Sequence, residues 1–249
     1  MTAVAGSALV TGASRGLGAA IATGLAAAGH PVAVGYREGR EAAQRVVEAI
    51  RAAGGTAEAV GGDVTTEAGV RRAVDAAEAA LGPVGVLVVN ATGPQPRTPT
   101  VGLDLAQVEP MLDFFVRSPV LLMASVVPGM VARGGGRIVH VGSEVAWSAP
   151  AGAAAYVAAK GAQHALARVS AKDLGPHGIT VNTVAPGWVP VERHADADPA
   201  DLAAYAATVP LGRQGTPGEV ASAVVWLASA EAGFVTGTVL PVTGGASMP

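Results

Sequence analysis

The sequence predicts an α/β protein built on a doubly wound parallel sheet of about seven strands flanked by helices. Short runs rich in Val, Ile and Leu alternate with longer Ala-rich segments of helical periodicity. The short runs lack polar alternation, which is typical of strands buried on both faces of a parallel sheet. The regular β-α-β order favours right-handed crossovers and a single sheet with helices on both sides.

Seven strands and seven helices follow from these patterns. The predicted strands are Ser7–Thr11, Pro31–Tyr36, Thr56–Val60, Val86–Asn90, Arg137–Gly142, Thr180–Val184 and Val239–Val242. The predicted helices are Leu17–Ala28, Arg40–Ala53, Glu67–Leu81, Gln107–Ala132, Ala153–Leu174, Ala200–Ala207 and Pro217–Ala228. No linker, repeat or low-complexity segment divides the chain, so we expect one Rossmann-type domain over residues 1–249.

Composition narrows the function classes. Half of the 249 residues are hydrophobic and 14% are charged, so the chain can form a large core. A net charge of −3 argues against nucleic acid or an anionic membrane as partner. The absence of cysteine excludes disulfides and thiolate metal sites, and we expect no metal. We see no signal peptide, and Pro119–Ala132 is too short to span a bilayer, so a cytoplasmic protein is expected.

The turn between the first strand and the first helix predicts a phosphate-binding cradle. Gly12 permits a tight turn, Gly16 lets the backbone approach a pyrophosphate, and Gly18 allows close packing of helix on strand. The helix N-terminus offers free N–H groups to phosphate oxygens. The predicted cofactor contacts here are Gly12, Ser14, Arg15, Gly16, Leu17 and Gly18. The alternative is an ordinary glycine-rich turn.

The ends of the second and third strands bear on cofactor choice. No acid ends the second strand, whose last residues are Tyr36 and Arg37. Arg15 and Arg37 can clamp a 2′-phosphate, so we predict NADP(H) rather than NAD(H); both arginines could instead be solvated surface residues. Asp63-Val64 is placed to face the adenine, although a turn or helix-capping aspartate is an equal reading.

Tyr156 and Lys160 are four residues apart and therefore share one helix face. A neighbouring ammonium favours phenolate and is expected to lower the pKa of the phenol. Ser143, thirteen positions before Tyr156, can hold a carbonyl or alcohol oxygen while the proton moves. Thr11, Asn90, Ser143 and Val184 all fall near strand carboxyl ends, where ligands of such sheets bind, so these groups should gather at one edge.

With these motifs the chain closely resembles the short-chain dehydrogenase/reductase family over nearly its whole length, most of all 3-oxoacyl-carrier-protein reductases and related ketoreductases. The matching motifs are Thr11 to Gly18, Asp63-Val64, Asn90-Ala91, the trio Ser143, Tyr156 and Lys160, Pro186-Gly187 and Gly244-Gly245. The resemblance implies hydride transfer between a nicotinamide and a carbonyl or alcohol carbon. It implies Tyr156 as general acid, Lys160 on the nicotinamide ribose, Ser143 on the substrate oxygen, and Asn90, Ala91, Pro186 and Gly187 beside the cofactor.

The chain departs from the family pattern at four places. Phe115 stands where the family has an asparagine that keeps a helix kink and a water linked to the lysine. We hypothesise that Pro119 frees the Phe115 carbonyl and so preserves that water; the alternative is a mere kink. Val191 replaces a threonine that contacts the carboxamide, which leaves backbone at Val189 as its partner. Thr92 replaces a glycine, and Thr243 replaces an aspartate with an effect expected on packing.

The segment from Trp188 to Gln214 is expected to form a substrate loop or lid over residues 188–214. Trp147, Trp188 and Tyr205 are candidates for its apolar walls. His194 reads as a loop histidine more readily than as a base. Glu144 follows Ser143 directly; successive residues point apart, so we expect it to face solvent or a second subunit rather than substrate.

The leading interpretation is an NADPH-dependent ketoreductase acting on a small carbonyl or alcohol compound, either free or carrier-bound. An alternative keeps the cofactor but performs isomerisation, dehydration or ring chemistry without net redox change. A non-catalytic nucleotide-binding protein is a third reading, which retention of Ser143, Tyr156 and Lys160 disfavours. The long helices Gln107–Ala132 and Ala153–Leu174 favour a homotetramer or homodimer.

Overall fold

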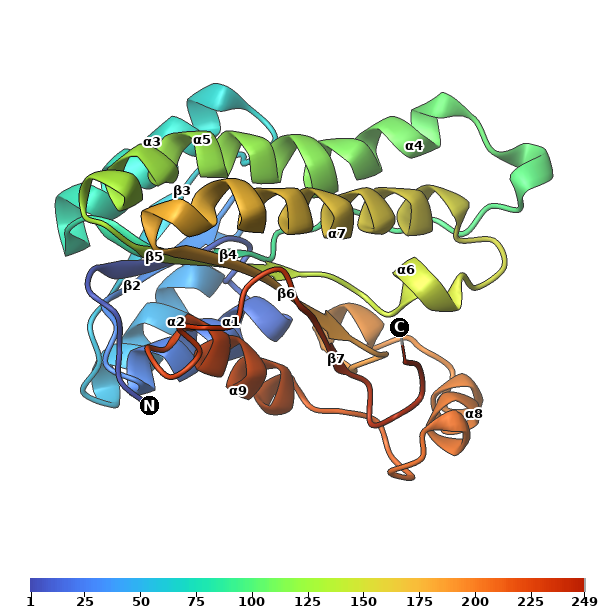
Figure 1. Ribbon diagram of the computed structural model, residues 1–249. Helices are drawn as coiled ribbons and strands as arrows, with labels where there is room; N and C mark the ends of the chain where they lie inside the picture. Colours follow the sequence, from blue (N-terminus) through green and yellow to red (C-terminus); the bar gives the residue numbers. More distant parts are fainter. Residues whose placement is uncertain (249) are drawn as a thin grey trace.

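The computed structural model describes residues 1–248, which contain one sheet of seven parallel strands in the order β3-β2-β1-β4-β5-β6-β7 (Figure 1). The strands are β1 (Ser7–Val10), β2 (Val32–Tyr36), β3 (Ala57–Gly61), β4 (Val84–Val89), β5 (Gly136–Val141), β6 (Ile179–Pro186) and β7 (Val239–Val242). The chain winds outward from β1 in both directions, so the predicted Rossmann-type doubly wound sheet is confirmed.

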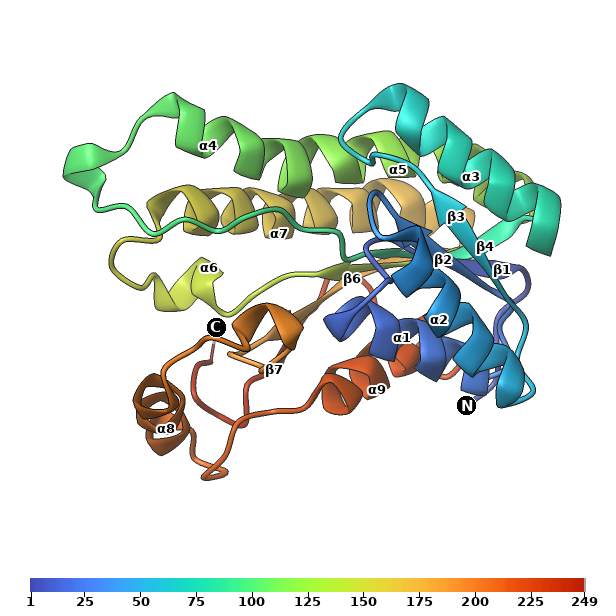
Figure 2. The same cartoon turned by 180° about the vertical axis from the view of Figure 1, so that it is seen from behind.

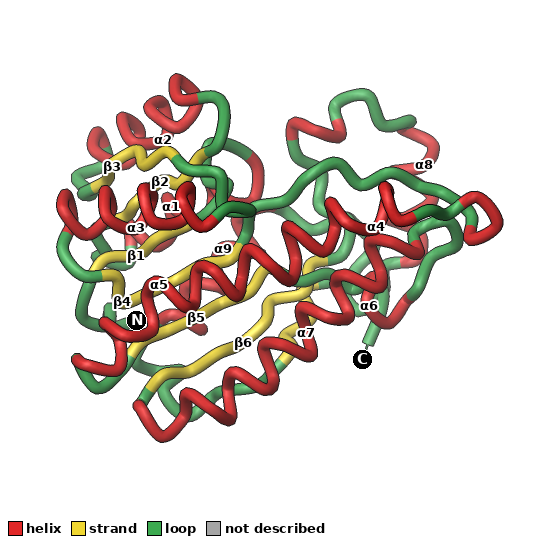
Figure 3. The backbone as a smooth tube through the Cα atoms, turned by 90° about the horizontal axis from the view of Figure 1, so that it is seen from above, coloured by secondary structure: helices red, strands yellow, loops and turns green. Residues whose placement is uncertain are grey.

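Helices cover both faces of this sheet. The α-helices are α1 (Gly16–Ala27), α2 (Arg40–Ala52), α3 (Glu67–Leu81), α4 (Leu105–Leu112), α5 (Ser118–Ala132), α6 (Val145–Ser148), α7 (Ala154–Leu174), α8 (Pro199–Thr208) and α9 (Pro217–Ala228). Short 3₁₀ turns are η1 (Thr100–Gly102), η3 (Gly175–His177) and η4 (Glu192–His194), and η2 (Asp113–Arg117) is a π-helical turn. Helices α3, α4, α5 and α7 lie on one face (Figure 3), and α1, α2 and α9 lie on the other (Figure 1).

Two apolar layers hold these helices to the sheet. Every residue of β1 and β4 is buried, so both faces of the central strands are covered. Ile21, Leu25 and Val224 pack beneath the sheet, and Leu87 and Leu122 pack above it with side chains that are fully buried. Burial of such a side chain contributes roughly 1.5–3 kcal/mol. These layers fix the strand ends on which the site is built.

The helix predicted over Gln107–Ala132 is interrupted. At η2 the Ser118 N–H donates to the Asp113 carbonyl, five positions earlier, and α5 begins with Pro119 at its second position. Proline has no N–H for a regular helical bond and its ring clashes with the carbonyl four residues before it. The irregularity expected from Pro119 is therefore present as a π-helical turn centred on Phe115, a form that often marks functional sites.

Two further differences from the sequence prediction concern the far end of the sheet. Helix α6, which begins two residues after Ser143, is not predicted from the sequence, because four residues carry no periodic signal. Strand β6 extends to Pro186 rather than ending at Val184, which brings the Pro186-Gly187 turn next to the sheet. Helices α6 and α8 lie with the C-terminal segment beyond the strand ends (Figure 2).

The stretch Leu105–Ala132 is long and apolar enough, by length and composition, to cross a membrane. The expectation that the apolar segment is too short counted only Pro119–Ala132, whereas the helical stretch spans 28 residues. In this fold it forms part of a layer: α5 contacts β4 and α3, and α4 contacts α7. Its inner side chains are accordingly core residues.

Candidate active site

The strand carboxyl ends bring the sequence-predicted residues to one edge of the sheet. The chain order reverses at β1, which lies between β2 and β4, and a crevice opens at such a switch point. The turns after β1, β4, β5 and β6 meet there and carry Gly12, Asn90, Ser143 and Gly187 respectively. Their convergence was the main structural expectation from the sequence.

The glycines of the β1–α1 turn form a tight cradle. Gly12 and Gly16 have φ angles of 63° and 57°, a region that favours glycine. At Gly18 an added Cβ would lie 2.3 Å from the Gly12 carbonyl oxygen and 2.6 Å from the Asn90 side-chain nitrogen. Arg15 precedes α1 in an extended conformation and makes no side-chain cap, so the first N–H groups of α1 remain available to an anion.

Thr11 and Asn90 fasten this cradle to the neighbouring strand. The Asn90 side-chain nitrogen donates to the Thr11 carbonyl at 2.8 Å and to the Gly12 carbonyl at 3.1 Å. The Thr11 hydroxyl accepts from the N–H groups of Asn90 at 2.9 Å and Ala91 at 3.1 Å. Asn90 and Ala91 are predicted to lie beside the cofactor. In this structure they form hydrogen bonds with Thr11 and Gly12 and so stabilise the glycine turn. Thr11 belongs to the same unit and was not singled out as a site residue.

The ends of β2 and β3 carry the charged groups. Arg15 and Arg37 are both exposed, and Arg37 pairs with Glu38 at 3.0 Å. Burial opposes ionisation of Asp63, but hydrogen bonds from the Thr65 hydroxyl and N–H, and the charges of Arg37 and Arg72, lower its pKa overall. Asp63 therefore makes a turn with Thr65, one of its two predicted readings, and stays ionised close to Arg37.

Ser143 and Tyr156 meet at the mouth of the site. Ser143 is 9% exposed, and Tyr156 is half-buried on the first turn of α7. Burial raises the pKa of Tyr156, while hydrogen bonding with Ser143 and Gln95 and the charge of Arg193 act in the opposite direction. Gln95 was missed by sequence reasoning. Its side-chain nitrogen donates to the Thr92 hydroxyl at 3.1 Å, so the threonine in place of a glycine has a structural role.

Lys160 lies beneath Tyr156 rather than beside its hydroxyl. Its Nζ is 5.8 Å from the centroid of the Tyr156 ring and donates to the Val141 carbonyl at 2.7 Å. Burial, together with the charge of Arg193, lowers the pKa of Lys160 well below its ordinary value. The expected lowering of the Tyr156 pKa by Lys160 is wrong for this structure, because the ammonium is turned toward the sheet and burial of the phenol dominates.

Phe115 occupies the position of the family asparagine. Its ring is buried, stacks edge-on against Tyr156 with centroids 5.5 Å apart, and has the Lys160 Nζ 3.9 Å from its centroid. The π-helical turn gives this ring its place, since it lies at the centre of η2. The water proposed between the Phe115 carbonyl and Lys160 stays a prediction.

Glu144, next to Ser143, forms a hydrogen bond with Tyr205 of the predicted lid, residues 188–214. Its carboxylate accepts a hydrogen bond from the Tyr205 hydroxyl at 2.8 Å and another from the Ser247 hydroxyl, and Tyr205 accepts from the Trp188 N–H at 2.9 Å. The expectation that Glu144 faces solvent is wrong: the side chain is buried, because α8 folds back over it. Burial, with the Glu144 charge adding to it, raises the pKa of Tyr205 to about 12.

The turn after β6 joins the same arrangement. The Pro186 carbonyl accepts from the Glu144 N–H at 3.1 Å, and an added Cβ at Gly187 would lie 2.3 Å from the Tyr205 hydroxyl. Val189 is 5% exposed. Val191 lies over the phosphate cradle, 3.4 Å from where a Gly16 Cβ would be. The residues of this turn are thus placed between the cradle and the lid.

Other residues of the lid and the C-terminus have structural contacts. His194 accepts from the Val191 N–H at 3.3 Å and so closes the short turn η4, as expected of a loop histidine. Trp188 packs on Tyr205, whereas Trp147 faces inward to His164 with ring centroids 5.9 Å apart. Thr243 donates to the Ser247 carbonyl at 3.1 Å, which fits the expected packing role.

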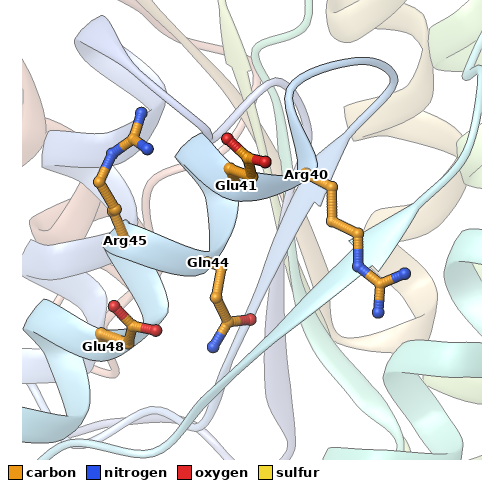
Figure 4. A pocket seen from close by; sticks show the side chains of 5 residues that line it. All are labelled: Arg40, Glu41, Gln44, Arg45 and Glu48. Carbon is orange, nitrogen blue, oxygen red and sulfur yellow. The ribbon is translucent and has the colours of Figure 1, made fainter.

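A hollow of about 400 Å³ on the outer face of α2 lies apart from these groups (Figure 4). It is lined by Arg40, Glu41, Gln44, Arg45 and Glu48. All but Gln44 are exposed, so this is a solvated, charged helix face. It contains none of the residues that the sequence motifs indicate.

Two histidines are buried between the sheet and α7. His140 on β5 is fully buried and neither ring nitrogen has a hydrogen-bond partner; His164 on α7 packs its Nε2 against Gly142. Burial, followed by the charges of Lys160 and His164, lowers the pKa of His140 to about 3. Burial, followed by Lys160 and Arg168, lowers that of His164 to about 4. Both rings are therefore neutral at physiological pH.

We expect the protein to lose stability as the pH falls from 6.5 toward 3. In this range His140 and His164 bind protons in the unfolded protein but stay neutral in the folded protein. The folded pKa lies below the unfolded one, so the stabilisation is complete above the unfolded value and is lost below it. His140→Leu should reduce the loss between pH 6.5 and 4 by about 3 kcal/mol, measured by urea unfolding at each pH. His177→Leu, at an exposed position, is the control; equal effects in both variants would contradict this account.

Comparisons with known proteins agree with this geometry. Residues 12–247 match the family described as enoyl-(acyl carrier protein) reductase. Cis-4-hydroxycyclohexanecarboxylate dehydrogenase of Sinomonas cyclohexanicum is 39% identical over 239 residues, which cover 96% of this chain and 95% of the relative. A crystal structure of a 3-oxoacyl (acyl-carrier-protein) reductase from Agrobacterium tumefaciens C58 with NADP bound is 37% identical, with a TM-score of 0.91 over 98% of this chain and 95% of that one.

A second solved structure is that of 7α-hydroxysteroid dehydrogenase complexed with NADH and 7-oxo glycochenodeoxycholic acid. It is 32% identical and has a TM-score of 0.93, and the match covers 98% of this chain and 95% of that chain. The two solved structures contain NADP and NADH respectively, and the three similar proteins differ widely in the compound that their names state.

Proposed function

The chain belongs to the short-chain dehydrogenase/reductase family of oxidoreductases that act on alcohol and ketone groups, and we propose that it is an NADPH-dependent ketoreductase. One observation carries this proposal: Ser143 and Tyr156 come together at the same sheet edge as the glycine cradle. A nucleotide-binding protein without activity would need the cradle alone. We propose residues 1–249 as one catalytic domain, with residues 188–214 as its substrate lid.

The cradle fits a dinucleotide. At Gly12 and Gly18 an added Cβ would lie 2.9 Å or less from backbone atoms, so only glycine fits these two positions. Glycines at these places are typical of a turn whose backbone approaches the phosphates of a dinucleotide. The proposed contacts are Gly12, Ser14, Arg15, Gly16, Leu17, Gly18, Tyr36, Arg37, Asp63, Val64, Asn90, Ala91, Tyr156, Lys160, Pro186, Gly187 and Val189. When bound, the reduced nicotinamide supplies a hydride to the carbonyl carbon.

The protein's own residues would handle the proton. Tyr156 donates its hydroxyl proton to the substrate oxygen, and Ser143 holds that oxygen with a hydrogen bond. A raised pKa keeps the Tyr156 phenol protonated at neutral pH, as an acid in the reductive direction requires. Lys160 would hold the nicotinamide ribose, and Glu144, Tyr205 and Ser247 would keep the lid closed over the substrate.

A two-cofactor assay tests the proposal. Absorbance of NADPH and of NADH is followed against β-ketoesters, diketones and quinones. Steady oxidation with a carbonyl compound supports a ketoreductase; tight cofactor binding with conversion of substrate but no change in cofactor absorbance would instead support the redox-neutral alternative. Whether the substrate is carrier-bound is tested by adding carrier-bound β-ketoacyl compounds to the same panel.

Cofactor preference gives a sharper prediction. Arg37→Ala should lower the ratio of kcat/KM for NADPH to that for NADH by about 10–100-fold, because a charge-assisted hydrogen bond to the 2′-phosphate is lost. The exposed Arg45 of α2 supplies a matched control, since Arg45→Ala removes an equal charge from a face without site residues (Figure 4). An unchanged ratio in Arg37→Ala would show that this arginine is only solvated.

Assembly remains a prediction of a homodimer or homotetramer. Exposed apolar side chains lie on α5 and α7, with Val120 45% and Val169 57% exposed, and Phe234, in the segment between α9 and β7, is fully exposed. Such faces commonly bury against a second copy of the same chain.

A further inference from the structure

The amine of Lys160 has two hydrogen-bond acceptors and an aromatic ring beside it within the chain. Its Nζ donates to the Val141 carbonyl at 2.7 Å and to the Gln163 side-chain oxygen at 3.0 Å. The third side is covered by the Phe115 ring, 3.9 Å from the Nζ to the ring centroid. Lys160 is 3% exposed and Gln163 is 1% exposed, so water reaches neither side chain freely.

These partners favour the charged form of the amine over the neutral form. A carbonyl and an amide oxygen are acceptors, and the face of an aromatic ring attracts a cation, most strongly where water is excluded. Buried amines otherwise lose their proton, because burial penalises the charged form. Burying the polar end of Gln163 in the same layer would itself be costly without this hydrogen bond. The hydrogen bond between Lys160 and Gln163 therefore offsets part of the free-energy cost of burying both side chains.

We propose that Gln163 is a positioning residue for Lys160: with the Val141 carbonyl and the Phe115 ring it forms a seat that holds the amine beneath Tyr156 and opposes the loss of its proton. The seat lies on the inner side of Lys160, where the family asparagine is replaced by Phe115. Val141 belongs to β5, Gln163 to α7 and Phe115 to η2, so three elements fix one amine.

Other charged or titratable groups face Lys160 from every side. They are His140 on β5, His164 and Tyr156 on α7, and Arg193 on the lid turn η4. None of them supplies a negative charge, and Arg193 repels the ammonium. With no carboxylate to pair with, Lys160 depends on neutral acceptors, and Gln163 is the side chain among them.

The role of this seat in catalysis rests on the proposed function, in which Lys160 holds the nicotinamide ribose as a cation. A neutral amine would bind the ribose hydroxyls less well than a charged one. By raising the pKa of Lys160, the seat would thus raise the pH at which the affinity for the cofactor begins to fall.

The two-lysine sequence allows a direct test. Lys160 and Lys172 are the only lysines of the chain, so Lys172→Arg, at an exposed position, leaves one lysine signal in protein labelled with ¹³C at the lysine ε-carbon. In this background the Lys160 pKa is measured by NMR titration for the parent protein, Gln163→Met and Gln163→Glu. Methionine keeps the length and volume but removes the acceptor, and glutamate keeps an acceptor.

We expect Gln163→Met to lower the Lys160 pKa by about one to two pH units, the equivalent of one hydrogen bond to a charged group. Gln163→Glu should bring it to or above the parent value. Thr180→Val, which removes a buried hydroxyl that makes no hydrogen bond, is the control and should leave it within a few tenths. An unchanged pKa in Gln163→Met, or an equal shift in Thr180→Val, would overturn the proposal.

Cofactor affinity provides a second measurement. NADPH binding, followed by fluorescence from pH 6 to 10, should weaken at a pH one to two units lower in Gln163→Met than in the parent. A uniform weakening at all pH values would indicate a merely structural role and contradict the proposal. A Lys160 pKa that follows the variants in a protein that oxidises NADPH with no carbonyl compound would support the seat and count against the ketoreductase.

Discussion

Tyr156→Phe should lower kcat for carbonyl reduction by about 10²–10⁴-fold, the usual contribution of a general acid. The substitution removes the hydroxyl that would pass a proton to the substrate oxygen, while Ser143 can still hold that oxygen. The phenylalanine ring keeps the edge-on contact with Phe115, whose centroid lies 5.5 Å away. Cofactor binding should change little, so the loss should appear in kcat.

The measurement is steady-state oxidation of NADPH under saturating substrate, with thermal unfolding as the check on folding. Half-burial of Tyr156 and its hydrogen bonding with Ser143 and Gln95 allow a modest change in stability. A variant that unfolds like the parent and keeps its kcat would remove Tyr156 from the mechanism. A loss that comes with lost NADPH affinity would point to a role in binding instead.

Gly18→Ala should weaken cofactor binding at the glycine turn between β1 and α1. Its Cβ would lie 2.3 Å from the Gly12 carbonyl oxygen, 2.6 Å from the Asn90 side-chain nitrogen and 2.8 Å from the Ala13 Cα. Two of these atoms are backbone and the third is held by two hydrogen bonds, so none can yield cheaply. Overpacking of this kind costs about 1–3 kcal/mol and shifts the backbone around it.

We expect NADPH affinity to fall at least about tenfold in Gly18→Ala, together with a lower Tm, because the strain falls on the turn that the phosphates would contact. Gly218→Ala, in the first turn of α9, is the matched control: its Cβ would come no closer than 3.9 Å to the Thr216 hydroxyl. An alanine that costs nothing at position 18 would mean that the cradle is looser than its geometry indicates.

The sequence predicted the fold and the place of the site because both depend on local patterns. Short runs rich in apolar residues predicted all seven strands, and parallel strands put their carboxyl ends at one edge. Tyr156 and Ser143 therefore had to approach the turn that carries Gly12 and Gly18. Pro119 similarly indicated the position of the irregular turn, since proline lacks the N–H that a regular helix needs and clashes with the carbonyl four residues before it.

What could not be predicted depends on contacts between distant residues or on the choice of a rotamer. Glu144 meets Tyr205, 61 residues away, and Ser247, 103 residues away, and nothing near Glu144 in the sequence indicates either partner. The spacing of Tyr156 and Lys160 placed both on one helix face but did not decide where a flexible lysine directs its ammonium. That direction follows from the Val141 carbonyl and Gln163.

The central claim, that hydride passes to a carbonyl carbon in this site, is tested most directly with NADPH deuterated at C4. A carbonyl compound that the enzyme reduces is incubated with each C4-deuterated epimer, and the alcohol is examined by NMR and mass spectrometry. We predict one deuterium on the carbinol carbon from one epimer only, and little or none with Tyr156→Phe. An alcohol or rearranged product that forms at the parent rate without deuterium from either epimer would contradict the claim.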